Sequence, residues 1–410
     1  MKKKKLNILL ISQNFWPENF PINAVIENLS NKVNFTILTG KPNYPGGEIF
    51  DNYKKFGVIK ENFSKYHKII RVPIYPRKKA NKINLFLNYM SFLFSGIFFG
   101  FFYTRKNKFD LILVNCPSPA TQIAIGLFFK KIYNLKMMTW VQDIWPESLY
   151  ETGHLKKNFL YNFINYIFNF FYKQNNLLLL QSDGFLKNFQ KKKINNKKIV
   201  VPNPADETLK KFFFKKNKLI KFKKKYFNIV YTGNIGTAQP FEKFCFVLNK
   251  IYKVNKNIIF HIFGEGKNKI KLIHDAKVLR CKNIKIYSYV NKSNLPGIYR
   301  QSDALLVMLK DKSIFNITIP SKFQNYLFFK KPILGWINGE TKKIIDRNNC
   351  GLVSSAENVT QFQNMILKTF KLHKSGKLKS LGNNSYKLYK NRYTMKKICK
   401  LLTDSFEKCL

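Results

Sequence analysis

A lysine at the expected start of a helix is the first feature of the sequence that suggests chemistry. Ser321 is followed three residues later by Gln324, a spacing typical of a capping box, so we expect a helix to begin at about Lys322. The first amides of such a helix and its dipole stabilise an anion, and Lys322 adds a positive charge at the same place. The stretch 318–340 therefore predicts either a phosphate-binding helix start or an ordinary helix start with a surface lysine.

Two glycine-containing turns follow apolar runs in the same half of the chain. The run 227–232 leads into GNIG, with Pro240 as a helix-start signal, and the run 258–263 leads into GEG. A strand, a glycine turn and a helix amino end let the backbone approach a phosphate closely. The candidate phosphate-binding residues are therefore Gly233, Asn234, Gly236, Gly264, Gly266, Ser321 and Lys322.

Acidic and amide side chains follow apolar runs in the first half. Asp143 comes directly after the run 137–141, and a carboxylate there can orient a hydroxyl group or accept its proton. The alternative is that Asp143 only caps the following turn. Glu147 follows Pro146, which is equally typical of the first turn of a helix. Further candidate binding residues at loops after strands are Asn14, Glu18 and Gln142.

Strand-like and helix-like segments alternate along the chain, as in α/β folds with parallel sheets. The length of 410 residues suits two domains. We expect an N-terminal domain at 1–202 and a C-terminal domain at 226–390, joined by the lysine-rich linker 203–225. A final helix within 391–410 is expected to cross back to the first domain.

The net charge of +51 favours an anionic partner, but only seven of the 73 basic residues are arginines. Nucleic-acid binders favour arginine for its bidentate geometry, so the composition favours a membrane surface or a phosphorylated substrate over nucleic acid. The six cysteines show no CxxC spacing and the five histidines show no metal-binding pair. We therefore expect no metal, a reducing cytoplasm, and no cleaved signal peptide.

The segment 85–103 is nearly all Leu, Phe, Ile and Met and is flanked by lysines and Arg105. At about 1.5 Å per residue, it is almost long enough to span the apolar core of a bilayer. A crossing would separate strands of one alternating sheet, so we expect a helix that partly covers the sheet and partly enters the lipid interface. A wholly buried helix is the alternative. The aromatic segment 155–171 can lie on the same face.

Together these segments resemble family-4 glycosyltransferases, and the WbuB-like branch of O-antigen and capsule enzymes in particular. The segments that carry the resemblance are SQNFWPE (12–18), GKPNYPGG (40–47), WVQDIWPES (140–148), VPNPAD (201–206), YTGNIGTAQ (231–239), FGEG (263–266), IPSKFQNYL (319–327) and FKKPIL (329–334). The resemblance implies the GT-B fold, with two Rossmann-like domains facing an inter-domain cleft. It also implies a nucleotide-sugar donor, UDP-linked and without a metal, on the second domain. The implied acceptor, often a lipid-diphosphate sugar, is held by the first domain.

The sequence departs from the pattern of the family in three places. Gln142 stands where many members have histidine, and Asn19 and Phe20 replace a glycine loop near the donor diphosphate. Many members carry two glutamates eight positions apart, where this chain has Ile317 and Asn325. Asn325 is still able to hydrogen-bond a ribose hydroxyl, as donor or acceptor.

The resemblance implies a retaining glycosyltransferase that builds a cell-surface polysaccharide, and the apolar segment 85–103 with its basic flanks predicts that it is peripherally bound to the cytoplasmic face of the membrane. The expected donor sugar is an N-acetylated amino or deoxy sugar, with Asp143 as the catalytic residue. Two alternatives remain open: a nucleotide-sugar 2-epimerase of the same architecture, which needs cleft carboxylates and a histidine such as His154, and a catalytically decayed basic binding protein.

Overall fold

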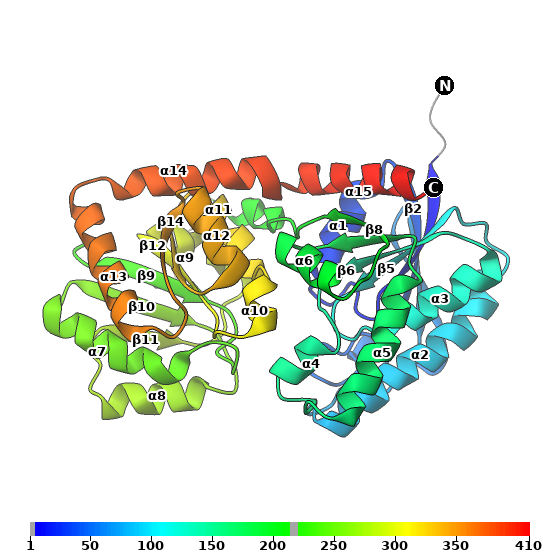
Figure 1. Cartoon of the computed structure of the whole chain (residues 1–410), viewed down its shortest axis with the longest axis horizontal. Coiled ribbons are helices and arrows are strands. Elements are labelled where there is room, and N and C mark those ends of the chain that lie inside the picture. Colours follow the sequence, from blue (N-terminus) through cyan, green and yellow to red (C-terminus); the bar gives the residue numbers. More distant parts are fainter. Residues whose placement is uncertain (1–4, 214–219) are drawn as a thin grey trace. The chain divides into compact units, whose positions relative to one another are not determined.

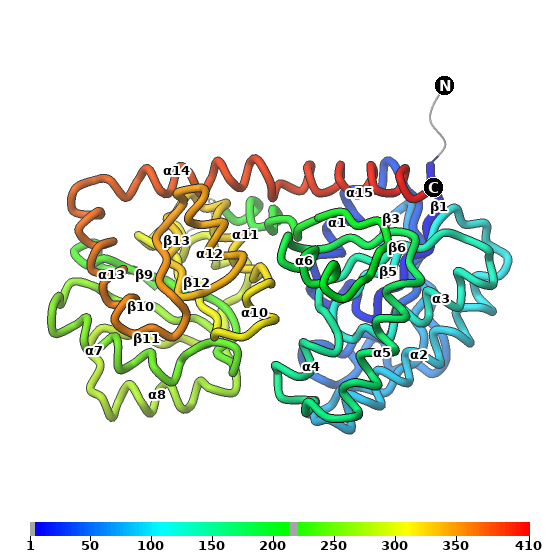
Figure 2. Tube along the Cα trace, in the orientation of Figure 1, coloured from blue at the N-terminus to red at the C-terminus, as the bar shows by residue number. Residues whose placement is uncertain are grey.

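The computed structural model describes residues 5–213 and 220–410, which form two compact units (Figure 1). The first unit comprises Met1–Pro202 together with Ile398–Leu410, and the second comprises Asn203–Lys397. Each unit is built around one sheet whose strands alternate with helices along the chain (Figure 2).

The first sheet has eight strands in the order β3-β4-β2-β1-β5-β6-β7-β8, and all neighbours are parallel except β3 and β4. Its strands are β1 (Leu6–Ile11), β2 (Val33–Gly40), β3 (Ile59–Ser64), β4 (His67–Val72), β5 (Leu111–Cys116), β6 (Met137–Val141), β7 (Leu177–Leu180) and β8 (Lys197–Val200). The predicted strands are present, and β3 was missed. Strand β3 lies at an edge of the sheet, and polar residues interrupt its sequence IKENFS. It therefore lacks the continuous apolar run that is typical of the other strands.

The helices of the first unit cover both faces of this sheet. They are α1 (Pro21–Leu29), α2 (Lys82–Thr104), α3 (Gln122–Tyr133), α4 (Glu147–Glu151), α5 (Phe159–Lys173) and α6 (Asp183–Lys191). Helix α3 contacts both α2 and α5, so these three lie on one face, as right-handed crossovers require. Helix α2 approaches closely because Gly96 and Gly100 have no side chain: a Cβ at Gly100 would lie 2.8 Å from Leu38 Cδ2.

The second sheet has six parallel strands in the order β11-β10-β9-β12-β13-β14. Its strands are β9 (Phe227–Thr232), β10 (Ile258–Phe263), β11 (Ile284–Tyr287), β12 (Ala304–Met308), β13 (Ile333–Trp336) and β14 (Gly351–Ser354). Its helices are α7 (Phe244–Val254), α8 (Lys269–Val278), α9 (Leu295–Gln301), α10 (Ser313–Ile317), α11 (Ser321–Phe328), α12 (Gly339–Arg347), α13 (Val359–Lys374) and α14 (Leu378–Leu388). Alternate strand residues face opposite sides: Ile229 and Tyr231 join one buried cluster, and Val230 joins the other.

The last helix, α15 (Met395–Cys409), begins in the second unit and ends in the first. Its residues Ile398, Leu402 and Phe406 are fully buried, and the thiol of Cys399 lies 4.0 Å from the carbonyl oxygen of Val25 in α1. The end of the chain therefore covers α1 on the face of the first sheet opposite to α2.

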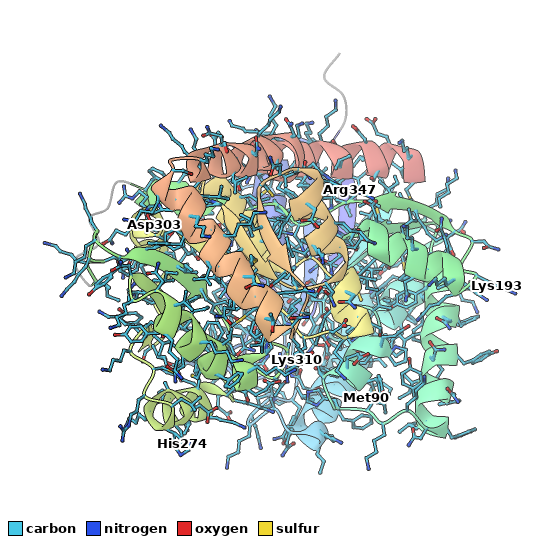
Figure 3. The ribbon with its side chains drawn as sticks, turned by 60° about the vertical axis from the view of Figure 1, so that its left-hand side comes forward. Met90, Lys193, His274, Asp303, Lys310 and Arg347 are labelled. Atoms are coloured by element: carbon cyan, nitrogen blue, oxygen red, sulfur yellow. The ribbon has the colours of Figure 1, made fainter. Side chains whose placement is uncertain are left out.

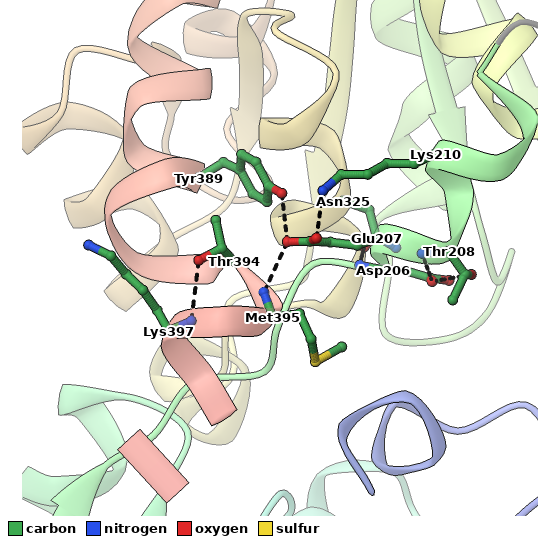
Figure 4. Close-up of polar contacts among 9 residues, drawn as sticks. All are labelled: Asp206, Glu207, Thr208, Lys210, Asn325, Tyr389, Thr394, Met395 and Lys397. Atoms are coloured by element: carbon green, nitrogen blue, oxygen red, sulfur yellow. Dashed lines mark hydrogen bonds and ion pairs between the residues drawn. The ribbon is translucent and has the colours of Figure 1, made fainter. Parts of the chain in front are cut away.

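The segment predicted as a linker, 203–225, is part of the second unit where it is described. Its 3₁₀ helix Glu207–Phe212 buries Leu209 in the core of that unit. The carboxylate of Glu207 accepts hydrogen bonds from the Tyr389 hydroxyl (2.6 Å) and the Met395 amide (2.9 Å) (Figure 4). The high lysine content suggested solvent-exposed chain, but the apolar residues between the lysines anchor it. Residues 214–219 of the predicted linker lie outside the described residues.

In each unit, an aspartate at an equivalent position forms two hydrogen bonds with the backbone of the central strand, β1 or β9. The Asn7 amide donates to the Asp110 carboxylate (2.7 Å), while the Asp110 amide donates to the Asn7 carbonyl (2.8 Å). Asn228 and Asp303 make the same pair of bonds, at 2.7 and 2.8 Å (Asp303 is labelled in Figure 3). These aspartates satisfy the amides of Asn7 and Asn228, each the second residue of its strand.

Replacing Asp110 or Asp303 with alanine is expected to lower the free energy of unfolding by about 1–3 kcal/mol, because each change leaves a partly buried amide without its charged acceptor. Urea denaturation of the purified variants measures the change. Asp51→Ala is the matched control, since Asp51 and its partner Lys54 are mostly exposed and such pairs contribute little. Equal stability of all three variants would show that these hydrogen bonds do not hold the central strands.

Candidate functional site

In the second unit, the loops after β9 and β10 are joined by backbone hydrogen bonds. The Gly233 amide donates to the Phe263 carbonyl (2.9 Å), and the Ile235 amide donates to the Glu265 carbonyl (2.8 Å). A Cβ at Gly264 would lie 1.9 Å from the carbonyl oxygen of Gly233. The glycines of GNIG and GEG therefore permit two loops to pack against each other.

The amides of Gly233 and Ile235, in the turn expected to approach a phosphate, are used in this packing. The Gly236 amide is used within its own loop, because it donates to Oε1 of Gln239 (3.1 Å). A Cβ at Gly266 would lie 2.4 Å from the carbonyl oxygen of Ile235, so Gly266 also serves the loop contact. The expectation that these amides are available to an anion is wrong for all three. Gly233 and Asn234 are nevertheless exposed at the surface of the turn.

Lys322 reaches this turn from helix α11. Its Nζ lies 3.7 Å from the centre of the Tyr231 ring, and a Cβ at Gly233 would lie 2.9 Å from it. The Nζ atom is buried and has no hydrogen-bond partner among the residues that the structure describes. Burial lowers the pKa of Lys322 from its usual 10.5 to about 7. Burying an ammonium group without a hydrogen-bond acceptor raises the free energy of the folded state. An anion bound beside this Nζ would offset that cost.

A buried hydroxyl cluster holds α11 against β9. The Thr232 amide donates to the Tyr326 hydroxyl (2.8 Å), and Oγ1 of Thr232 lies 2.7 Å from the Tyr299 hydroxyl and 3.1 Å from that of Tyr326. This cluster fixes the helix that carries Lys322 relative to the glycine turn. The sequence analysis missed it, and the tyrosine within the apolar face of α11 was the available signal.

The expected capping box at the start of α11 is wrong. The helix begins at Ser321, its N-cap residue is Pro320, and no side chain caps its first amides. Pro320 already has a helix-compatible φ, and the buried Gln324 amide donates instead to the carbonyls of Pro320 (2.8 Å) and Ser321 (2.9 Å). Ser321 therefore adjoins Lys322 at an uncapped amino end.

Asn325 is turned toward the chain before the 3₁₀ helix. Its Oδ1 accepts a hydrogen bond from the Asp206 amide (2.7 Å) (Figure 4). The Asp206 carboxylate pairs with Lys292 (2.5 Å). The predicted ribose contact is thus corrected in part, because the carbonyl oxygen of Asn325 is already used within the unit. The backbone amide of Asp206, in the segment VPNPAD, donates the hydrogen bond that orients the Asn325 side chain.

In the first unit, Asp143 links the loops after β5 and β6. Its Oδ2 accepts a hydrogen bond from the Ser118 amide (3.1 Å), and the Trp145 indole donates to the Ser118 hydroxyl (3.1 Å). Helix α4 begins four residues later with no side-chain cap, so the alternative that Asp143 caps the following turn is wrong. Burial raises the pKa of Asp143, against the opposing effect of the Ser118 hydrogen bond.

Tyr89 of α2 packs against the loop that carries Asp143, and no sequence motif indicated it. Its ring packs against Trp145 with centroids 5.7 Å apart. Burial raises the pKa of Tyr89, while Arg77 and a hydrogen bond with Ser118 act against the shift. The charge of Asp143 raises the pKa of Tyr89 further. Tyr89 and Asp143 are linked through Ser118, whose amide donates to Asp143 and whose side chain hydrogen-bonds Tyr89.

Glu18 joins the first two loops of this unit. Its carboxylate accepts hydrogen bonds from the amides of Asn43 and Tyr44, both at 2.8 Å. Burial raises the pKa of Glu18 to about 7 although these hydrogen bonds lower it. Glu18 thus holds the loop KPNYPGG in place. This structural role was not part of the prediction, which gave Glu18 a role in acceptor binding. Asn14 differs, because its buried Oδ1 has no hydrogen-bond partner among the described residues.

The other two candidates of the first unit are held by their neighbours. Glu147 is the first residue of α4 and forms a partly buried ion pair with Lys192. The backbone of Gln142 is held on both sides, since its amide donates to the Cys116 carbonyl (2.9 Å) and its carbonyl accepts from Gln181 (2.7 Å). The ion pair with Lys192 is enough to explain Glu147 as a residue that stabilises the fold. Within residues 5–213 and 220–410, no group of three His, Cys, Asp or Glu side chains is arranged to hold a metal.

Comparisons with known proteins identify the fold. No protein-family model matches the chain. A probable glycosyltransferase, WbjE of Pseudomonas aeruginosa, is 23% identical over 292 residues, which are 67% of this chain and 69% of that protein. A sucrose-phosphate synthase from Thermosynechococcus elongatus has a TM-score of 0.76 at 12% identity, over 98% of this chain and 99% of that chain. Anabaena HepE, solved with UDP and glucose, has a TM-score of 0.68 at 10% identity, over 98% and 100%. The predicted GT-B architecture of two Rossmann-like domains is confirmed.

Replacing Lys322 with methionine is expected to stabilise the protein near pH 7, on the order of 1–3 kcal/mol, because the change removes a buried charge that has no hydrogen-bond acceptor among the described residues. The folded pKa of Lys322 lies below 10.5, so the unfolded chain binds the extra proton between pH 7 and 10.5. Wild-type stability therefore rises with pH in this window, and the gain of the variant shrinks.

The measurement is the difference in Tm between variant and wild type from pH 7 to 10, with the exposed Lys368→Met as control. A gain that does not depend on pH would mean that the Lys322 ammonium is not desolvated.

Proposed function

We propose that this chain is a glycosyltransferase that moves a sugar from a UDP-linked donor to a lipid-linked or polysaccharide acceptor in cell-surface polysaccharide synthesis. The observation that carries the proposal is the buried Nζ of Lys322, which lies beside Gly233 and has no hydrogen-bond acceptor in the described part of the chain. The diphosphate of a nucleotide-sugar supplies the missing negative charge. Supporting evidence comes from the likeness to WbjE and from HepE, a protein of the same fold solved with UDP and glucose.

The donor half of the proposal uses only residues of the second unit. Lys322 pairs with the diphosphate, and the uncapped amides at the start of α11 face the same charge. As the bond between the sugar and the diphosphate breaks, negative charge grows on the leaving oxygen, and a preorganised cation stabilises it. We propose no metal, because the ammonium and the helix start fill that role. The exposed Asn234 at the glycine turn is placed for a further contact.

The acceptor half uses the first unit. In the transfer, the acceptor hydroxyl oxygen forms a bond to the anomeric carbon, and the bond from that carbon to the phosphate oxygen breaks with its electron pair. The acceptor proton passes to Asp143, whose pKa is raised by burial, so that its carboxylate is a better base than an exposed aspartate. Asn14 offers a buried oxygen that accepts a hydrogen bond from another acceptor hydroxyl.

The finer parts of the proposal follow the resemblance to the WbuB-like branch of family 4. They are retention of the anomeric configuration, an N-acetylated amino or deoxy sugar, an O-antigen or capsule product, and a lipid-diphosphate acceptor at the cytoplasmic face of the membrane. Ile317 and Asn325 stand where many members carry glutamates. The Asn325 contact to Asp206 keeps its carbonyl oxygen from the donor, so we propose that ribose binding relies on other groups.

Lys322→Met is expected to weaken binding of a UDP-sugar by about 10- to 100-fold, the scale of a charge-assisted hydrogen bond of about 1–3 kcal/mol. The diphosphate of a nucleotide-sugar does not titrate near neutrality, so pH acts through the protein. Since the pKa of the unoccupied Lys322 is about 7, wild-type affinity falls as the pH rises above that value, and binding takes up a proton.

Isothermal titration calorimetry of UDP-, GDP- and dTDP-sugars in buffers of different ionisation enthalpy measures both the affinity and the proton uptake. Lys368→Met serves as the control for charge at a distance. Unchanged affinity of Lys322→Met would remove the diphosphate from this position.

Asp143→Asn is expected to lower turnover by about 10²- to 10⁴-fold, the usual contribution of a general base. The amide oxygen of asparagine still accepts from the Ser118 amide, so Tm and donor affinity change little. Transfer of labelled sugar to purified membranes measures turnover. The companion variant Asp143→Ala loses that hydrogen bond as well and is expected to lower the Tm. Near-normal turnover of Asp143→Asn would leave Asp143 with a structural role alone.

A further inference from the structure

Helix α2 presents aromatic side chains on the side away from the sheet. Its buried side packs on α3 and β2 through residues that include Phe92, Gly96 and Gly100. On the other side, Phe86, Phe94, Phe98 and Phe102 are between 49% and 67% exposed. A surface helix of a water-soluble unit normally carries polar side chains there. The outward side of α2 is therefore suited to an apolar environment.

Helix α5 repeats this arrangement. Phe159, Phe163, Tyr166 and Phe170 are spaced by four, three and four residues, which places them on one stripe, and they are between 51% and 85% exposed. The inward residues Phe168 and Tyr172 are buried. Since α3 contacts both α2 and α5, the two aromatic stripes belong to the same face of the first unit. Single exposed apolar residues are ordinary, but two parallel aromatic stripes on one face are not.

Helix α2 is long and apolar enough to cross a membrane, but the sheet forbids a crossing. Strand β1 precedes α2 in the chain and β5 follows it, and these strands pair directly, with Ile8 opposite Leu111. A bilayer between them would break that ladder. Helix α2 therefore meets lipid only along its outward side, parallel to the membrane surface.

Basic residues stand at the ends of both helices. Lys78, Lys79 and Lys82 lie at the start of α2, and Arg105 and Lys106 follow its end. Lys156 and Lys157 precede α5, and all of these are exposed. Basic ends and an aromatic centre match a lipid interface, which is anionic at the headgroups and apolar beneath them.

We propose that this face docks on an anionic lipid surface, with its aromatic side chains entering the headgroup and acyl boundary. The α2–α5 surface is defined by Phe86, Phe94, Phe98, Phe159, Phe163 and Tyr166. The inference deepens the membrane location proposed above and rests on it only for the place of the acceptor. A second copy of the chain is the poorer partner, because pairing two such faces would bring the lysines of two chains with a net charge of +51 each together.

The test is flotation of the full-length protein with vesicles of phosphatidylcholine alone or mixed with phosphatidylglycerol, at about 0.1 M and about 1 M salt. The surface variant replaces Phe94, Phe98, Phe163 and Tyr166 with serine. Its matched control replaces Phe246 and Tyr289 with serine, because these aromatics are similarly exposed, at 48% and 67%, on the second unit. UDP-sugar affinity and Tm are measured for every variant.

The expected result is binding of wild type and control to the anionic vesicles, with part of it retained at high salt, and at least a roughly tenfold loss for the surface variant. Complete release of the wild type by salt, or equal binding of the surface variant, would overturn aromatic insertion. A wild-type dimer that the surface variant dissociates would assign the surface to a second copy instead. Donor affinity separates the two proposals, because its absence in all variants contradicts the transferase function and leaves the vesicle result unaffected.

Discussion

The central constraint of each unit is that its first strand pairs on both sides with parallel strands reached by crossovers in opposite directions. Strand β1 lies between β2 and β5, and β9 lies between β10 and β12. The loops leaving the two sides diverge at that point, which opens a place for ligand groups at the carboxyl ends of the strands. The Gly233 turn follows β9, and the loop that carries Asn14 and Glu18 follows β1. Both candidate half-sites therefore arise from the same topological feature.

Much of this topology could be predicted because buried parallel strands require continuous apolar runs, and these runs are plain in the sequence. Strand β3 escaped prediction since an edge strand needs no such run. Local chemistry was harder to predict. Glycines at 233, 264 and 266 indicated close backbone approach, but only the structure shows that the approaching group is another loop. Likewise, the Ser321 spacing could not show that the helix begins at Ser321 with Pro320 as its N-cap residue. The sequence around Asn325 could not show the hydrogen bond between Asn325 and Asp206.

Each unit contains a candidate site residue with an unsatisfied buried polar atom. The second has a buried donor, Nζ of Lys322, with no acceptor among the described residues, and the first has a buried acceptor, Oδ1 of Asn14, without a donor in that same part of the chain. Other predicted site residues are held by neighbours: the Glu18 carboxylate accepts hydrogen bonds from backbone amides, and Oε1 of Glu147 pairs with Lys192. Groups that weaken the fold are the better evidence for ligand binding, because a folded chain without a ligand gains nothing by burying them.

Helix α15 has a consequence for the order in which the protein is made. Its buried residues Ile398, Leu402 and Phe406 cover the face of the first sheet that carries α1. The ribosome synthesises these residues only after the second unit has been synthesised. The apolar surface of α1 that they cover is therefore exposed until α15 is made, and it is open to chaperones until then. Synthesis of the two units is sequential, but completion of the first waits for α15.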